Sequence, residues 1–119
     1  MFRQGNVTLM VKDLDRSVRY YTEVLGLRLK GKADGQWAEL EGPGIHIGLH
    51  PRRPEISDEG SGTAAIGFEV DDLDATISTL MGRGVAVGRV LGGPDRRMAL
   101  FDDPDGNHIF VIRRLPQAR

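Results

Sequence analysis

The stretch that decides the fold is "VKDLDRSV" at residues 11–18, because a near copy, "VDDLDATI", occupies residues 70–77. The second copy starts 59 positions after the first (70 − 11), so the repeat divides the 119 residues into two halves. Similar segments at a fixed offset indicate repeated structural units. We expect one domain over residues 1–119, with a first module at 5–50, an exposed linker at 51–62 and a second module at 63–114.

Each copy joins a run of alternating apolar residues to a segment with the apolar spacing of a helix. The alternating runs, which predict strands with one buried side, place Val7, Leu9 and Val11 together in the first half and Ile66, Phe68 and Val70 together in the second. Apolar spacing predicts helices near 14–25 and 73–82. Either of two carboxylates can cap each helix, Asp13 or Asp15 in the first half and Asp72 or Asp74 in the second. Gly26, and Gly82 or Gly84, are expected at the helix ends.

Three short runs follow each predicted helix, separated by glycine or proline, a pattern typical of strands joined by tight turns. They span residues 27–33, 36–41 and 45–50 in the first half and 85–91, 96–101 and 107–114 in the second. Each half therefore has the order strand, helix, strand, strand, strand, which predicts an α+β fold of two tandem βαβββ modules.

Composition narrows the class of partner. Sixteen basic and seventeen acidic residues give a net charge of −1, so no global field attracts nucleic acid or an anionic membrane. We expect a small-molecule partner instead. The chain has no cysteine, which excludes disulfides and thiolate catalysis, and no apolar stretch approaches the roughly 20 residues of a membrane span. A cytoplasmic location is expected.

Strand alternation assigns a set of side chains to the face of each sheet opposite its helix. If that face is concave, these side chains line a ligand site. They are Asn6, Thr8, Met10, His46, Gly48, His50, Glu69, His108 and Phe110. All three histidines belong to the set, either as outward polar residues or as hydrogen-bonding or titrating groups of a pocket, and His46, His108 and Glu69 are candidate catalytic groups. Trp37 is a further candidate contact, although its orientation is open between a ligand site and ordinary packing.

The carboxylate-rich stretch "FDDPDGNHIFVI" at residues 101–112 does not fit a calcium loop. An EF-hand ending its turn at Gly106 needs oxygen ligands at positions held by Phe101 and Ile112. Proline followed by Asp and Gly instead favours a tight turn before the last strand.

These two stretches carry a family likeness. "VKDLDRSVRYYTEVLGLRL" together with "FDDPDGNHIFVI" resembles the vicinal oxygen chelate superfamily, which contains glyoxalase I, extradiol dioxygenases and bleomycin-resistance proteins. The likeness runs from about Asn6 to Arg113. It implies modules that form an open, curled eight-stranded mixed sheet, a cup with the helices outside, usually in a homodimer. Whether the cup closes within one chain or between two swapped chains stays open.

The resemblance also locates the metal ligands of the family's enzymes. Those positions fall on Asn6, Gly48, Ala65 and Phe110 in this sequence, and none of them is His, Asp or Glu. We therefore expect no cofactor, and a divalent metal is disfavoured but stays an alternative. Phe110 either contacts a ligand or fills the space of the ion.

The resulting prediction is a glyoxalase/bleomycin-resistance-like protein that binds a small aromatic or amphipathic molecule without a metal. The alternative is a lyase, isomerase or dioxygenase of the same superfamily that uses a displaced metal site or acid-base residues. The fold alone does not choose between them.

Overall fold

The computed structural model describes residue 1 and residues 5–51 and 65–114. The chain divides into two compact units, Met1–Ser61 and Gly62–Arg119. Of the predicted linker at 51–62, all but Pro51 lies outside the described residues.

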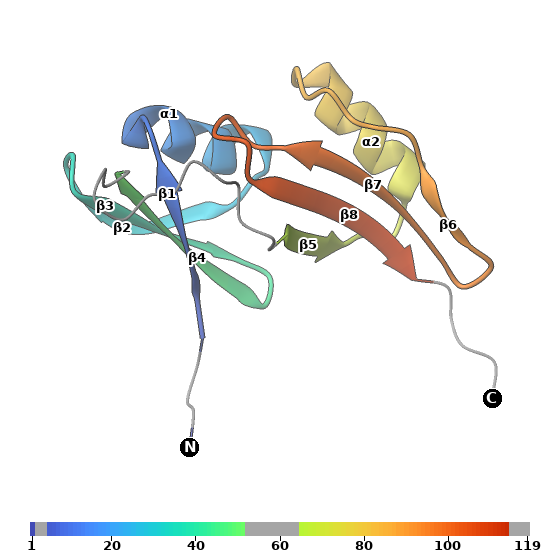
Figure 1. The fold of residues 1–119 in the computed structure, drawn as a ribbon, viewed down its shortest axis with the longest axis horizontal. Coiled ribbons are helices and arrows are strands. Elements are labelled where there is room, and N and C mark those ends of the chain that lie inside the picture. The colour runs from blue at the N-terminus through green and yellow to red at the C-terminus, as the bar shows by residue number, and fades with distance from the viewer. Residues whose placement is uncertain (2–4, 52–64, 115–119) are drawn as a thin grey trace. The chain divides into compact units, whose positions relative to one another are not determined.

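The first unit contains one four-stranded sheet and one helical segment (Figure 1). Its strands run in the spatial order β1-β4-β3-β2, with β1 parallel to β4 and the other pairs antiparallel. The helix α1 packs against β3 and β4, which leaves the opposite face of the sheet free of helix. The elements are β1 (Val7–Val11), α1 (Leu14–Arg19), η1 (Tyr20–Val24), β2 (Arg28–Ala33), β3 (Trp37–Gly42) and β4 (Ile45–Pro51).

The second unit repeats this plan. Its sheet has the order β5-β8-β7-β6, with β5 parallel to β8. The helix α2 packs against β7 and β8 (Figure 1). The elements are β5 (Ala65–Glu69), α2 (Leu73–Gly82), β6 (Leu91–Gly93), β7 (Arg96–Asp102) and β8 (His108–Arg114). The α+β fold of two βαβββ modules is thus confirmed, with the eight strands in two four-stranded mixed sheets.

Equivalent aspartates begin the two helices. The carboxylates of Asp13 and Asp72 accept hydrogen bonds from the backbone N–H groups of Arg16 at 3.1 Å and Ala75 at 3.0 Å. Each thereby satisfies a donor that the first helical turn leaves unpaired. Of the two caps predicted for each helix, the structure selects the first.

The helix predicted near 14–25 is confirmed as far as Val24, but it changes from an α-helix to a π-helix in its second half. The α-helix ends at Arg19, and residues 20–24 form a wider π-turn in which the N–H of Leu25 donates to the carbonyl of Tyr20 at 3.1 Å. The wider turn accompanies complete burial of Tyr21, whose ring packs edge-on against that of Tyr20.

The strand predicted at 85–91 was wrong in extent, because β6 covers only Leu91–Gly93. The N–H of Val85 donates to the carbonyl of Leu80 at 3.0 Å, so the start of this segment completes the end of α2. Gly84, with φ of 90°, supplies the left-handed residue at this helix end. Gly88 makes a single bond to the carbonyl of Leu100.

Each core lies between a helix and the face of its sheet that the helix covers. The fully buried apolar side chains of the first unit come mainly from β3 and β4, and those of the second from β7 and β8. They include Val11, Tyr21, Ala38, Leu40, Ile47 and Leu49, and Ala99, Ile109 and Val111. Val7 is 38% exposed, so β1 is buried only toward its carboxyl end. Within the described residues, no helix is both long enough and apolar enough to span a membrane.

Candidate functional site

The side chains on the helix-free face of the first sheet form what we call the first face. Alternation sets them opposite the buried Ala38, Leu40, Ile47 and Leu49. On β1, β3 and β4, the first face consists of Thr8, Met10, Trp37, Glu39, Glu41, His46, Gly48 and His50. Five of these, Thr8, Met10, His46, Gly48 and His50, were assigned to this face from the sequence. Asn6 is exposed and lies one residue before β1.

Carboxylates from β3 occupy much of the first face, and the sequence analysis missed them. Glu41 is the register partner of both His46 and Arg28 and forms an ion pair with Arg28. The Nε2 atom of His46 lies 3.8 Å from an oxygen of Glu41. Glu39 is similarly paired with Lys30 on β2, at 3.7 Å. His46 is therefore held beside a carboxylate that already has a cationic partner.

Trp37 also lies on the first face. A Cβ placed on Gly31 would be 3.6 Å from Cη2 of the indole ring, an ordinary van der Waals distance. The ring therefore rests on the glycine backbone of β2, and Trp37 is 39% exposed. Its free surface is an aromatic platform beside the polar groups of β3 and β4.

The helix-free side of the second sheet, which we call the second face, is more apolar in its centre. Phe110 and Ile112 come from β8, and Met98 and Leu100 are their register partners on β7. The complete second face consists of Ala65, Gly67, Glu69, Leu91, Gly93, Arg96, Met98, Leu100, Asp102, His108, Phe110, Ile112 and Arg114. Leu100 is 39% exposed, which is high for a large apolar side chain next to a half-buried phenylalanine.

Phe110 covers the backbone of the neighbouring strand. A Cβ placed on Gly67, its register partner on β5, would lie 2.7 Å from Cε1 of the ring and closer still to Cε2 and Cζ. Only a residue without a side chain leaves room for the ring in this position. The second face therefore has its own aromatic platform, lying flat across β5 and β8.

Charged pairs lie at the two ends of this apolar centre. At one end, Nδ1 of His108 is 2.8 Å from an oxygen of Asp102, its register partner on β7. At the other, Nε of Arg114 donates to Glu69 at 2.7 Å. The predicted site residues Glu69, His108 and Phe110 thus share one face, and Asp102 and Arg114 are the partners that sequence reasoning missed.

The carboxylates of Asp102 and Asp103, at the turn before β8, make hydrogen bonds within the protein. Asp103 is only 5% exposed and accepts hydrogen bonds from the N–H groups of Asp105 and Asn107 and from the Asn107 side-chain amide, at 2.8–2.9 Å. Gly106 has φ of 83°, as the predicted tight turn requires. Asp103 organises this turn, and Asp102 bonds to His108.

The positions that the family likeness assigns to metal ligands do not fit a divalent ion. Asn6 offers one neutral oxygen, whereas Gly48 and Ala65 offer no ligand atom and Phe110 an apolar ring. In residues 5–51 and 65–114, no three His, Asp or Glu side chains are grouped closely enough to hold a metal.

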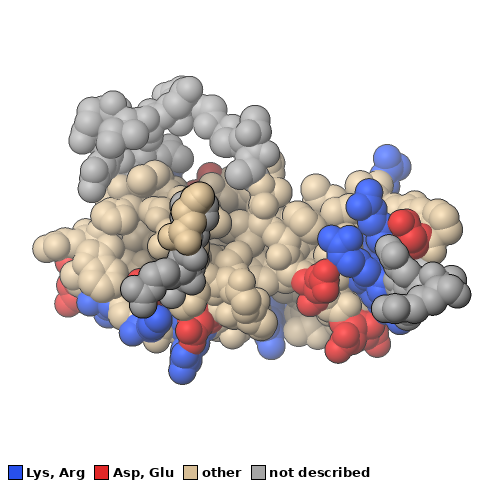
Figure 2. Space-filling model, turned by 90° about the horizontal axis from the view of Figure 1, so that it is seen from below, with Lys and Arg blue, Asp and Glu red and all other residues tan. Residues whose placement is uncertain are grey.

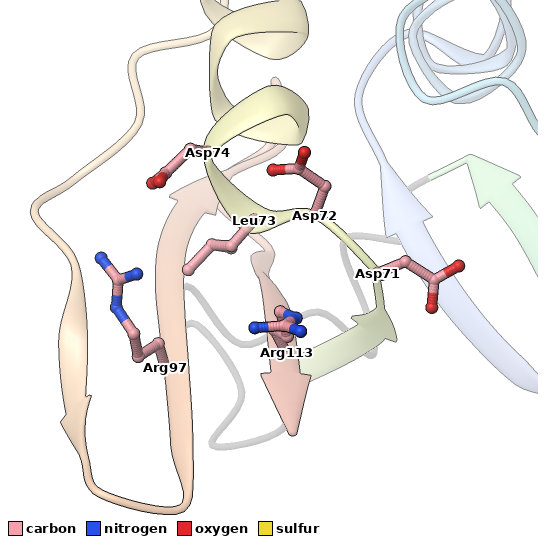
Figure 3. A pocket seen from close by; sticks show the side chains of 6 residues that line it. All are labelled: Asp71, Asp72, Leu73, Asp74, Arg97 and Arg113. Atoms are coloured by element: carbon pink, nitrogen blue, oxygen red, sulfur yellow. The ribbon is translucent and has the colours of Figure 1, made fainter. Parts of the chain in front are cut away.

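A hollow of about 270 Å³ lies on the other side of the second sheet, at the start of α2 (Figure 3). Arg97 and Arg113, which are register partners, line it together with Leu73 and three aspartates, Asp71, Asp72 and Asp74. Figure 3 shows Asp71 pointing away from the arginines, and Asp72 is engaged as the helix cap. Four of the residues that line the hollow belong to the start of α2 or directly precede it, and none of its lining residues is a predicted site residue.

The surface charges are mixed in sign. On the side of the molecule drawn in Figure 2, acidic and basic side chains lie next to one another instead of gathering into a patch of one sign. This side of the molecule gives no electrostatic reason to expect a polyanionic partner.

Comparison with known proteins agrees with the fold. Residues 3–111 match the model of the Glyoxalase/Bleomycin resistance protein/Dioxygenase superfamily. A probable lactoylglutathione lyase of Vibrio parahaemolyticus is 31% identical, over 88% of this chain and 86% of its own length. A probable chloroplastic lactoylglutathione lyase of Arabidopsis thaliana is 29% identical over 96% of this chain, which spans only 36% of that relative.

Among solved structures, TnmS3, an antibiotic binding protein from Streptomyces sp. CB03234, is similar over most of its length. It has a TM-score of 0.79 and 27% identity, over 96% of this chain and 97% of that one. The relatives thus include proteins named as lyases and a protein named for ligand binding.

Proposed function

Because this chain belongs to the glyoxalase/bleomycin resistance protein/dioxygenase superfamily, we propose that it binds a small aromatic or amphipathic molecule on its helix-free faces, without a metal ion. One observation carries the proposal: at a position assigned to a metal ligand, the ring of Phe110 lies flat over Gly67. A side chain that would hold an ion is thereby replaced by one that contacts apolar ligands.

The surroundings of Phe110 suit such a ligand. Met98 and Leu100 extend the apolar centre beside the buried Ile112, while the pairs Asp102–His108 and Glu69–Arg114 mark its polar ends. Apolar burial contributes about 25 cal/mol for each Å² removed from water, and the few polar groups give the ligand its orientation. The similarity to an antibiotic binding protein supports this class of function.

The first face supplies a second aromatic surface of the same kind. Trp37 rests on Gly31 much as Phe110 rests on Gly67. Thr8, Met10 and His50 lie on this face and are proposed as further ligand contacts. We also include Asn6, His46 and Gly48 in the proposed site. The proposal uses each face separately and needs no particular placement of one unit on the other.

The test is a thermal-shift screen of aromatic antibiotics and metabolites, followed by titration of the compounds that stabilise the protein. Phe110→Ala is expected to weaken their binding about 10-fold, the equivalent of about 1.4 kcal/mol. Met81→Ala, which removes a 58% exposed apolar side chain on α2, serves as the matched control. Equal affinity for Phe110→Ala and the parent protein would contradict the proposal.

One observation favours a second candidate, a lyase or isomerase that transfers a proton without a metal. The Asp102–His108 pair has the geometry of a histidine base oriented by a carboxylate, and the relatives named as lactoylglutathione lyases make this class relevant. Product analysis after long incubation separates the two functions. Multiple turnovers that His108→Ala abolishes and Phe110→Ala spares would establish the enzyme and overturn simple binding.

A further inference from the structure

The pair formed by Asp102 and His108 sets the hydrogen-bonding character of one end of the second face. Nδ1 of His108 lies 2.8 Å from Oδ1 of Asp102, with about half of each side chain exposed. An ionised carboxylate can only accept hydrogen bonds. The proton of the neutral imidazole therefore resides on Nδ1, and Nε2 carries the lone pair.

Nε2 is the remaining polar atom of this ring. Among the described residues it has no hydrogen-bond partner, and the register neighbours of His108 are Ala65 on β5 and Asp102 on β7. Neither neighbour offers Nε2 a donor, since Ala65 has no polar side chain and Asp102 is engaged at Nδ1. The atom is thus left as an acceptor on the second face.

His108 and Phe110 are neighbours on this face. They are two residues apart on β8, a separation of about 6.7 Å along a strand, comparable with the length of two fused aromatic rings. A flat molecule that stacks on the Phe110 ring can therefore present a substituent at its edge to Nε2.

We infer that the ligand is a hydroxylated aromatic molecule, whose hydroxyl group donates to Nε2 of His108 while its ring covers Phe110. Asp102 is the positioning residue, because it holds the proton on Nδ1. The inference rests on the proposed binding function and adds the chemical class of the ligand. It predicts discrimination against ligands that carry an acceptor but no donor at this edge.

Two probes with the same naphthalene ring test the inference: 2-naphthol, which has a hydroxyl donor, and 2-methoxynaphthalene, which has none. Titrations of both probes are run in the same buffer at a single pH. The parent protein is expected to bind 2-naphthol roughly 3- to 10-fold more tightly, the effect of one neutral hydrogen bond. His108→Ala should bring the two affinities together by weakening 2-naphthol alone.

The role of Asp102 has its own variant. In Asp102→Asn, the side-chain amide can donate to Nδ1 as well as accept from it, so the proton is no longer fixed on Nδ1. The preference for 2-naphthol should fall to less than half its parent value, while Asp74→Asn, which removes the same charge on the α2 side, should keep it. Full preference in Asp102→Asn would refute the positioning role.

The outcomes separate this inference from the proposed function. Equal binding of both probes by the parent protein, or a preference that survives His108→Ala, overturns the hydroxyl contact but leaves aromatic binding in place. No binding of either probe overturns the hydroxyl contact, whereas binding that is unaffected by Phe110→Ala overturns both, because both place a ligand ring on Phe110. Loss of the preference in His108→Ala, with 2-methoxynaphthalene still bound, supports both.

Discussion

The ring of Phe110 lies over the backbone of Gly67, its register partner on β5, so closely that a Cβ on Gly67 would be 2.7 Å from Cε1 and nearer to two further ring atoms. The pair explains a glycine in the middle of a strand, where glycine otherwise weakens pairing. It also fixes the ring in a flat orientation. Substitution of Gly67 therefore tests the aromatic platform without removing the phenylalanine.

Gly67→Ala should reduce the affinity for aromatic ligands by about 10-fold, as Phe110→Ala does, because the ring must swing away from the new methyl group. The atoms in the way belong to the far end of a side chain, so the free energy of unfolding should fall by no more than about 1 to 3 kcal/mol. Titration and urea denaturation measure the two effects. Gly93→Ala is the control, since a Cβ there meets open space; unchanged affinity in Gly67→Ala would argue against the platform.

Asp103→Ala should lower the free energy of unfolding by about 2 to 3 kcal/mol, because the N–H groups of Asp105 and Asn107 lose a buried acceptor. Asp34→Ala removes a carboxylate that is 96% exposed and should change stability by less than about 0.5 kcal/mol. Urea denaturation of both variants provides the comparison. A mild effect of Asp103→Ala would mean that the turn does not depend on this side chain.

Local patterns predicted most of the fold. The repeat at 11–18 and 70–77, with its capping aspartates, marks both helix starts, and strand alternation identifies Ile47, Leu49 and Ile109 as buried. The patterns did not predict the type of helix at residues 20–24. Apolar spacing at 14–25 does not distinguish an α-helix from one that ends in a π-turn.

The candidate site was predictable only along single strands. Alternation on β8 identified His108 and Phe110, but Asp102 enters the site through its register with His108, a relationship between β7 and β8 that one strand does not reveal. Glu41 meets His46 in the same way, across β3 and β4. Alternation applied to residues 37–42 would have assigned Glu39 and Glu41 to this face.

Protein purified without chelator should contain much less than one divalent ion per chain, because the side chains at the four family ligand positions are Asn6, Gly48, Ala65 and Phe110. Elemental analysis measures the metal content directly, and added zinc, nickel or manganese should leave the melting temperature unchanged. Near-stoichiometric metal that is lost in His46→Ala or His108→Ala would show that a displaced site exists and would favour the enzyme.

The chain is expected to be a homodimer in solution. β1 and β2 form the edges of one sheet, and β5 and β6 those of the other, so each sheet leaves outer backbone groups that pairing between chains can cover. A closed two-fold dimer is the commonest symmetric way to cover such edges. Light scattering across a dilution series from high to low micromolar concentration should give twice the mass of the 13.1 kDa chain. A monomer throughout this range would contradict the prediction, and ligand binding would then have to be a property of the single chain.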